Sequence, residues 1–96
     1  MNKRVLKASV GAMSSDLLLE TYFRAAMHQL TDEQRTELHA KISQTYTTTV
    51  RRINRPPKGD RKAVRMHYRN LIQDYQDAMV KLCDELNAYS SEKKAK

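Results

Sequence analysis

The 96-residue chain has few of the residues that end regular secondary structure, with only two glycines and two prolines. So few turn residues favour a small number of long helices over many short strands. The chain also has a single cysteine, Cys83, which excludes an internal disulfide bond. One isolated thiol is typical of a reducing compartment, so we predict a cytoplasmic protein.

Long apolar segments are missing as well. No run approaches the roughly 18–20 residues that span a bilayer, so we expect no membrane partner. Lys7 and Ser9 interrupt the apolar residues near the N-terminus, which argues against a signal peptide. We interpret residues 1–13 as a flexible basic leader and residues 91–96 as a disordered basic tail. Residues 14–90 are then long enough for a single helical domain.

The sequence contains no recognisable catalytic or metal-binding motif. His28, His39 and His67 are not spaced like metal ligands, either with one another or with Cys83. There is no glycine-rich phosphate loop, no nucleophile elbow and no carboxylate pair beside an obvious base. We therefore expect no catalytic residues, no metal and no cofactor, and we predict that the protein is not an enzyme.

Three helices are predicted, at about residues 15–30, 32–54 and 61–89. Ser14 and Asp16 can cap the first helix, and Thr31 with Gln34 has the form of a capping box for the second. The third helix has the clearest amphipathic pattern. Its apolar residues recur every three or four positions: Val64, Tyr68, Leu71, Tyr75, Met79, Leu82, Leu86 and Tyr89.

The second helix is expected to end at a proline pair. Pro56 pushes the preceding Arg55 out of the helical region, and Asp60 is a suitable N-cap for the third helix. Two long amphipathic helices joined by a few residues pack side by side in opposite directions. The predicted fold class is therefore all-α, dominated by a long antiparallel helical hairpin with a basic Pro-Pro bend.

The first helix is more apolar than one buried face requires. Leu17, Leu18 and Leu19 are consecutive, so they point in three directions around the helix. Packing in two layers buries about one stripe of a helix. The excess indicates a helix that lies between neighbours or contacts another chain. The candidate protein interface consists of Leu17, Leu18, Tyr22 and Phe23.

Positive charge is concentrated around the predicted bend. Between Arg51 and Arg69 there are eight basic residues and one acid, a net charge of +7 that equals the charge of the whole chain. The residues expected to bind a partner or an anion are Arg51, Arg52, Arg55, Pro56, Pro57, Lys58, Arg61, Lys62, Arg65 and Arg69. The excess of arginine over lysine favours paired hydrogen bonds to phosphate or carboxylate oxygens.

The third helix begins with basic residues, although its N-terminus already carries a positive partial charge. Arg61 and Lys62 lie in this first turn, and a bound anion would remove the electrostatic cost. Arg61, Arg65 and Arg69 follow one another every four residues, which places them along one flank of the helix. Tyr68 lies among them, and core packing is favoured over stacking on a base.

The proline pair at positions 56 and 57 has two interpretations. The Pro56-Pro57 bend is favoured as a rigid turn, with recognition by a prolyl isomerase as the alternative.

The chain as a whole resembles small accessory proteins of lambdoid phages of the anti-RecBCD type. The resemblance consists of its small size, the apolar segment SSDLLLETYFRAAM and the basic segment RRINRPPKGDRK. This resemblance implies a phage-encoded protein in the host cytoplasm.

Three functions are therefore expected. The first, implied by the resemblance, is a non-enzymatic protein that binds and modulates, and in that family inhibits, a larger host enzyme acting on nucleic acid, such as the RecBCD recombination nuclease. The second is direct binding of DNA or RNA through the basic bend. The third is a structural homodimer built from helices.

Overall fold

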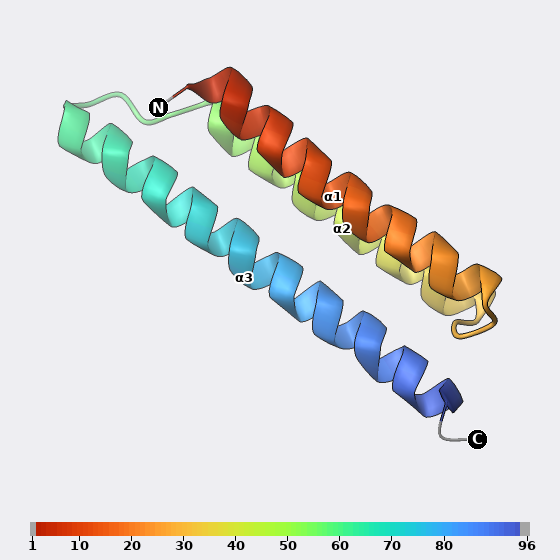
Figure 1. The fold of residues 1–96 in the computed structure, drawn as a ribbon. Helices are drawn as coiled ribbons and strands as arrows, with labels where there is room; N and C mark the ends of the chain where they lie inside the picture. Colours follow the sequence, from red (N-terminus) through yellow and green to blue (C-terminus); the bar gives the residue numbers. More distant parts are fainter. Residues whose placement is uncertain (1, 95–96) are drawn as a thin grey trace.

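Three helices make up the protein in the computed structural model, which describes residues 2–94. They are α1 (Lys3–Ala26), α2 (Asp32–Asn54) and α3 (Arg61–Lys94), and no strand occurs within this range. Helices α1 and α3 run in the same direction and α2 runs in the opposite one (Figure 1). The bundle measures 56 × 19 × 17 Å and is therefore a short rod. The predicted all-α class with three helices is confirmed.

Helix α1 begins twelve residues earlier than predicted. Asn2 is its N-cap, and the Asn2 side chain accepts a hydrogen bond of 2.9 Å from the backbone N–H of Arg4. From Lys3 onward the predicted flexible leader is helical, and of this leader only residue 1 lies outside the described part of the chain. The predicted start near residue 15 was wrong because it relied on Ser14 and Asp16, which are good capping residues. In the structure Ser14 is buried in the middle of α1.

The C-terminus of α1 forms a Schellman motif four residues before the predicted end. The N–H of Gln29 bonds to the carbonyl of Arg24, and the N–H of His28 bonds to the carbonyl of Ala25. His28 adopts a left-handed φ of 60°, a conformation usually taken by glycine. This motif stops the helix and lets the chain turn into α2.

The ends of α2 and the start of α3 agree with the sequence. Thr31 and Gln34 form both hydrogen bonds of the capping box, and the Asp60 carboxylate accepts the N–H of Ala63 at 2.9 Å. Residues 55–60, with both prolines, connect the two helices. Helix α3 continues to Lys94, so residues 91–94 are helical and not a disordered tail. Residues 95–96 of that predicted tail lie outside the described residues.

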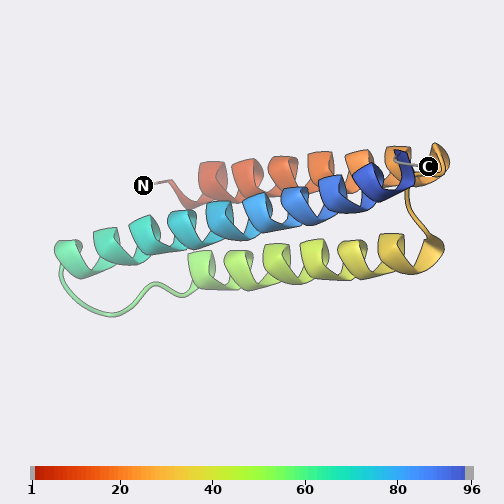
Figure 2. The same cartoon turned by 90° about the horizontal axis from the view of Figure 1, so that it is seen from below.

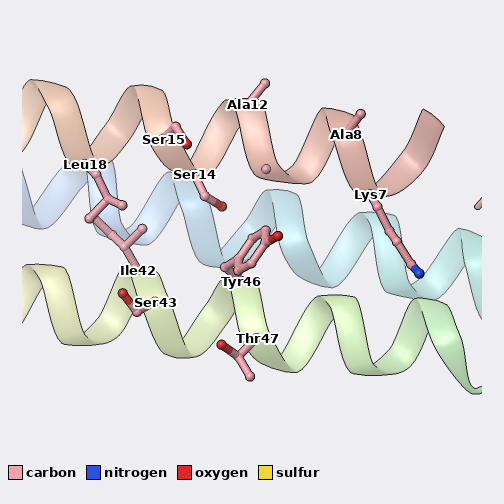
Figure 3. Close-up of a pocket in the computed structure, with 11 residues that line it drawn as sticks. Lys7, Ala8, Ala12, Ser14, Ser15, Leu18, Ile42, Ser43, Tyr46 and Thr47 are labelled. Carbon is pink, nitrogen blue, oxygen red and sulfur yellow. The ribbon is translucent and has the colours of Figure 1, made fainter. Parts of the chain in front are cut away.

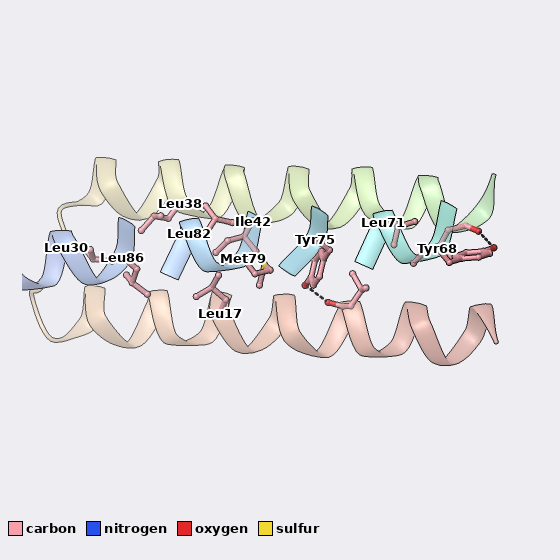
Figure 4. Packing of buried hydrophobic residues seen from close by; sticks show 12 residues of the cluster. Leu17, Leu30, Leu38, Ile42, Tyr68, Leu71, Tyr75, Met79, Leu82 and Leu86 are labelled. Atoms are coloured by element: carbon pink, nitrogen blue, oxygen red, sulfur yellow. Dashed lines mark hydrogen bonds between the residues drawn. The ribbon is translucent and has the colours of Figure 1, made fainter. Parts of the chain in front are cut away.

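The core follows the long axis of the bundle (Figure 4). On α3 the predicted stripe from Tyr68 to Leu86 is buried, and its end members Val64 and Tyr89 are half-buried. Leu38, Ile42 and Ile53 of α2 are at most 1% exposed. Truncating any of these three to alanine would cost about 2–5 kcal/mol, because each leaves a cavity. Cys83, which follows the core residue Leu82, is exposed.

The predicted dominance of α2 and α3 is not confirmed. Helix α1 packs along the whole length of α2, and more closely than α3 does. It also makes specific contacts with α3. Arg24 of α1 donates hydrogen bonds to Asn87 at 2.7 Å and to Ser90 at 3.2 Å. The molecule is therefore a bundle of three helices in which α1 takes a full share of the packing.

Candidate anion-binding site at the basic end of the bundle

Three segments that are distant in sequence meet at one end of the rod: the start of α1, the end of α2 and the start of α3 (Figure 2). We call this region the basic end. Its eleven cationic residues are Lys3, Arg4, Lys7, Arg51, Arg52, Arg55, Lys58, Arg61, Lys62, Arg65 and Arg69. Asp60 is the one acid in these segments, so their formal charge is +10 against +7 for the whole chain. The remainder of the protein is therefore net acidic.

A groove of about 460 Å³ opens at the basic end. Lys3, Arg61 and Arg65 provide its cationic side chains. Pro56 and Gly59 form part of its wall, and Val64 and Tyr68 also line it. Cations from two helices around one concave surface suit an anionic group, since each can donate a charge-assisted hydrogen bond to it.

The backbone adds to this positive field. Helices α1 and α3 both begin at the basic end, and a helix N-terminus carries a positive partial charge. Neither first turn contains an acidic residue, so side-chain charge and helix dipole have the same sign there. The caps Asn2 and Asp60 offset this field in part, and so does the negative partial charge at the C-terminus of α2, which lies at the same end. An anion bound at this end would be stabilised by both sources.

Most of the predicted binding residues are available at the surface. Arg51, Arg55, Pro57, Lys58, Arg61, Lys62, Arg65 and Arg69 are exposed, and Pro56 is half-buried. Arg52 differs from the others because its guanidinium lies 2.8 Å from the carboxylate of Asp74 on α3. This ion pair satisfies part of the charge of Arg52. The ladder of Arg61, Arg65 and Arg69 is the most accessible set.

Two side chains of α3 hold the end of α2 in place beside the groove. His67 Nε2 donates to the carbonyl of Arg52 at 2.9 Å, and the Tyr68 hydroxyl donates to the carbonyl of Ile53 at 3.1 Å (Figure 4). The last carbonyls of a helix lack partners within the helix, so these bonds stabilise its C-terminus. Tyr68 is 6% exposed, which confirms the prediction that it packs in the core.

Sequence reasoning missed the contribution of α1 to this site. The sequence predicts a flexible leader that contains Lys3, Arg4 and Lys7, whereas the structure places Lys3 in the groove with Arg61 and Arg65. Asn2 was the available signal, because it is a preferred N-cap residue directly before the basic residues. With Asn2 interpreted as an N-cap, the sequence predicts that the charges of Lys3, Arg4 and Lys7 lie at the start of a helix.

The predicted protein interface on α1 is divided by the fold. Leu17 is buried in the core, and half-buried Leu18 lies between α1 and α2. Tyr22 and Phe23 are exposed, and so are Leu19 and Met27, which follow the same side of the helix. The Tyr22 ring is partly held by α2, where it meets the His39 ring edge-on at a centroid distance of 4.2 Å.

Other kinds of site find no support within residues 2–94. This part of the chain contains no group of histidine, cysteine and carboxylate side chains that could hold a metal ion. None of its helices is long and apolar enough to cross a membrane. Comparisons with protein-family models, with curated proteins and with solved structures gave no match to this chain.

Proposed function

We propose that the protein is a non-enzymatic nucleic-acid-binding protein that holds the phosphate backbone at its basic end. The observation that supports this most is the groove between Lys3, Arg61 and Arg65, surrounded by the other cations of the basic end. Nucleic acid is the anion that offers a row of phosphates to such a row of cations. A single small anion would leave most of these side chains unused.

The side chains at this end favour contact with the backbone over reading of bases. Arg61, Arg65 and Arg69 stand about 6 Å apart along one flank of α3, so they can follow successive phosphates. Tyr68, the aromatic residue of the groove, is buried and bonded to Ile53, so it offers no face for base stacking. Binding should therefore depend strongly on salt and weakly on sequence.

Fluorescence anisotropy with labelled single strands and duplexes of several sequences tests this function. Affinity should fall steeply with salt, and Arg65→Ala should reduce the slope of log K against log salt by about one unit. Lys81→Ala is the matched control, because Lys81 is an exposed cation of α3 outside the basic end. Equal losses for the two variants, or binding that survives the triple change of Arg61, Arg65 and Arg69 to alanine, would contradict the proposal.

A second candidate is the modulator of a nucleic-acid-processing enzyme that the resemblance implies. The exposed side chains of Leu19 and Phe23 favour it, because a binding surface for a larger protein needs apolar anchors. Affinity capture from lysate, with and without nuclease, separates the two candidates. A host enzyme retained after nuclease treatment supports the modulator, whereas material released by nuclease supports direct nucleic-acid binding.

A further inference from the structure

The outer face of α1, directed away from α3, carries several large apolar side chains that are exposed. The four buried residues of α1 are Val10, Ser14, Leu17 and Thr21, and two of them carry hydroxyl groups. The outer face has Leu19, Tyr22, Phe23 and Met27, whose side chains are 70%, 52%, 62% and 57% exposed. A surface helix normally presents polar side chains to solvent. The outer face of α1 is therefore built to be covered.

The two halves of this outer face have different shapes. The half after Ser15 has the bulky side chains of Leu19 and Phe23. The half before it borders a groove of about 710 Å³ between α1 and α2 (Figure 3). Most side chains around this groove are small, among them Ala8, Ala12, Ser43 and Thr47. One half of the face therefore projects and the other half is hollow.

These two halves complement each other when two copies of the chain pack α1 against α1 in opposite directions. A two-fold axis near Ser15 and Asp16 places Leu19 of one copy opposite Ala12 of the other. The same axis places Phe23 opposite Ala8. In such a symmetric contact each copy fills the groove of its partner, so the surface complements itself. Parallel packing would put bulky side chains against bulky ones and leave both grooves empty.

Charge favours the same arrangement. The basic end of the rod lies at the start of α1, and Asp32 and Glu33 begin α2 at the opposite end. Antiparallel packing brings Arg4 of one copy toward this acidic end of its partner, whereas parallel packing would bring the two basic ends together. Near the axis, Asp16 of one copy approaches Asp16 of the other, and the two carboxylates repel each other. Salt screens this repulsion because Asp16 is exposed.

We infer that the outer face of α1 is the interface of an antiparallel homodimer, with Leu19 and Phe23 of each copy seated over Ala12 and Ala8 of the other. The exposed large side chains of the face contribute roughly 500 Å² per copy, which reaches the lower end of specific interfaces at about 1,000 Å² for the pair. If the proposed function holds, the dimer carries its two basic ends in opposite directions, roughly 40 Å or more apart. It would then join two nucleic-acid segments.

Sedimentation equilibrium of the full chain without nucleic acid tests the dimer separately from the proposed function. The expected mass at high micromolar concentration is twice 11.2 kDa. Leu19→Glu and Phe23→Glu should each weaken dimerisation at least about 30-fold, because every substitution acts twice in a two-fold interface. Val80→Glu is the matched control, since Val80 is 59% exposed on α3, and it should dimerise like the wild type. Circular dichroism confirms that each variant is folded.

Mixing two variants tests the direction and register of packing. Leu19→Glu and Ala12→Lys each weaken their own homodimer, but an antiparallel heterodimer pairs the new glutamate with the new lysine. The mixture should therefore associate at least about tenfold more tightly than either variant alone. A wild-type chain that stays monomeric, a dimer insensitive to Leu19→Glu and Phe23→Glu, or a mixture no tighter than its components would overturn the inference. A monomer would leave this face to a larger partner.

Discussion

The hydroxyl groups of Ser14 on α1 and Tyr75 on α3 lie 2.7 Å apart in the interior of the bundle. The Tyr75 hydroxyl also bonds to the carbonyl of Val10 at 3.0 Å. A phenol has one proton, and the carbonyl can only accept, so Tyr75 donates to Val10 and Ser14 donates to Tyr75. These two bonds fix the position of α1 along α3, where apolar packing alone would permit sliding.

We expect Tyr75→Phe to reduce the free energy of unfolding by about 1–3 kcal/mol, because it leaves the buried hydroxyl of Ser14 without its partner. Urea denaturation measures this loss. The double variant with Ser14→Ala should be destabilised by less than the sum of the two single variants, since it removes both partners. Tyr46→Phe on α2 serves as control, because this side chain is 38% exposed, and it should change stability by less than about 0.5 kcal/mol. Strict additivity would contradict the coupling.

Alkaline pH should weaken the fold through the same tyrosine. Burial raises the pKa of Tyr75 above its ordinary value of 10.0, and the Ser14 hydrogen bond opposes this only in part. The unfolded chain then releases the phenolic proton more easily than the folded one. The stability that neutral Tyr75 contributes to the folded state is fully present below pH 10 and is lost as the pH rises beyond 10. Thermal unfolding between pH 9 and pH 11 should show a shallower decline for Tyr75→Phe than for the wild type.

The left-handed φ of His28 allows a stabilising substitution. Glycine adopts this conformation without the steric cost that a side chain meets, so His28→Gly should raise the free energy of unfolding by about 0.5–1 kcal/mol. The melting temperature should rise by about 2–8 °C in a domain of this size. Ala26→Gly, placed two residues earlier in the last turn of α1, is the control and should have the opposite sign. Stabilisation by both variants would show that φ is not the cause.

Mild acid should also destabilise the bundle, through His39. Its Nε2 atom is buried with no hydrogen-bond partner among the described residues. Burial, followed by the nearby Arg35 guanidinium, lowers the pKa of His39 from its ordinary 6.5. The unfolded chain therefore binds the proton more tightly, and stability declines as the pH falls through 6.5. In urea titrations at pH 5 and pH 7.5, His39→Leu should lose less stability than the wild type; an equal loss would exclude His39 as the source.

Lys3 provides the sharpest test of the site that tertiary structure assembles. Lys3→Glu places a carboxylate in the groove beside Arg61 and Arg65, so it should weaken nucleic-acid binding about tenfold or more at low salt. The same charge change at Lys81, outside the basic end, should have a much smaller effect. Fluorescence anisotropy at two salt concentrations compares them. Equal effects would mean that net charge, and not the basic end, controls affinity.

The sequence by itself determined that there are three helices and three of their six boundaries, namely both ends of α2 and the start of α3. The capping box of Thr31 and Gln34, the proline at position 56 and the N-cap Asp60 are local signals, and each acts within a few residues. The apolar spacing on α3 likewise identified the residues that are buried, because a stripe of this period can face only one side of a helix. The basic cluster from Arg51 to Arg69 was also evident from the sequence, because its residues are close together along the chain.

Only the tertiary structure decided which segments meet. From the sequence, Ser14 is a good candidate for the start of a helix, because serine is a preferred N-cap residue. In the structure its hydroxyl bonds instead to Tyr75, which is 61 residues further along the chain. Lys3 became part of the groove because α1 runs parallel to α3. The apolar excess of α1 was evident from sequence, but its division into buried Leu17 and exposed Leu19 and Phe23 depends on where α2 and α3 pack. Contacts between distant residues leave no local pattern, so the fold had to reveal them.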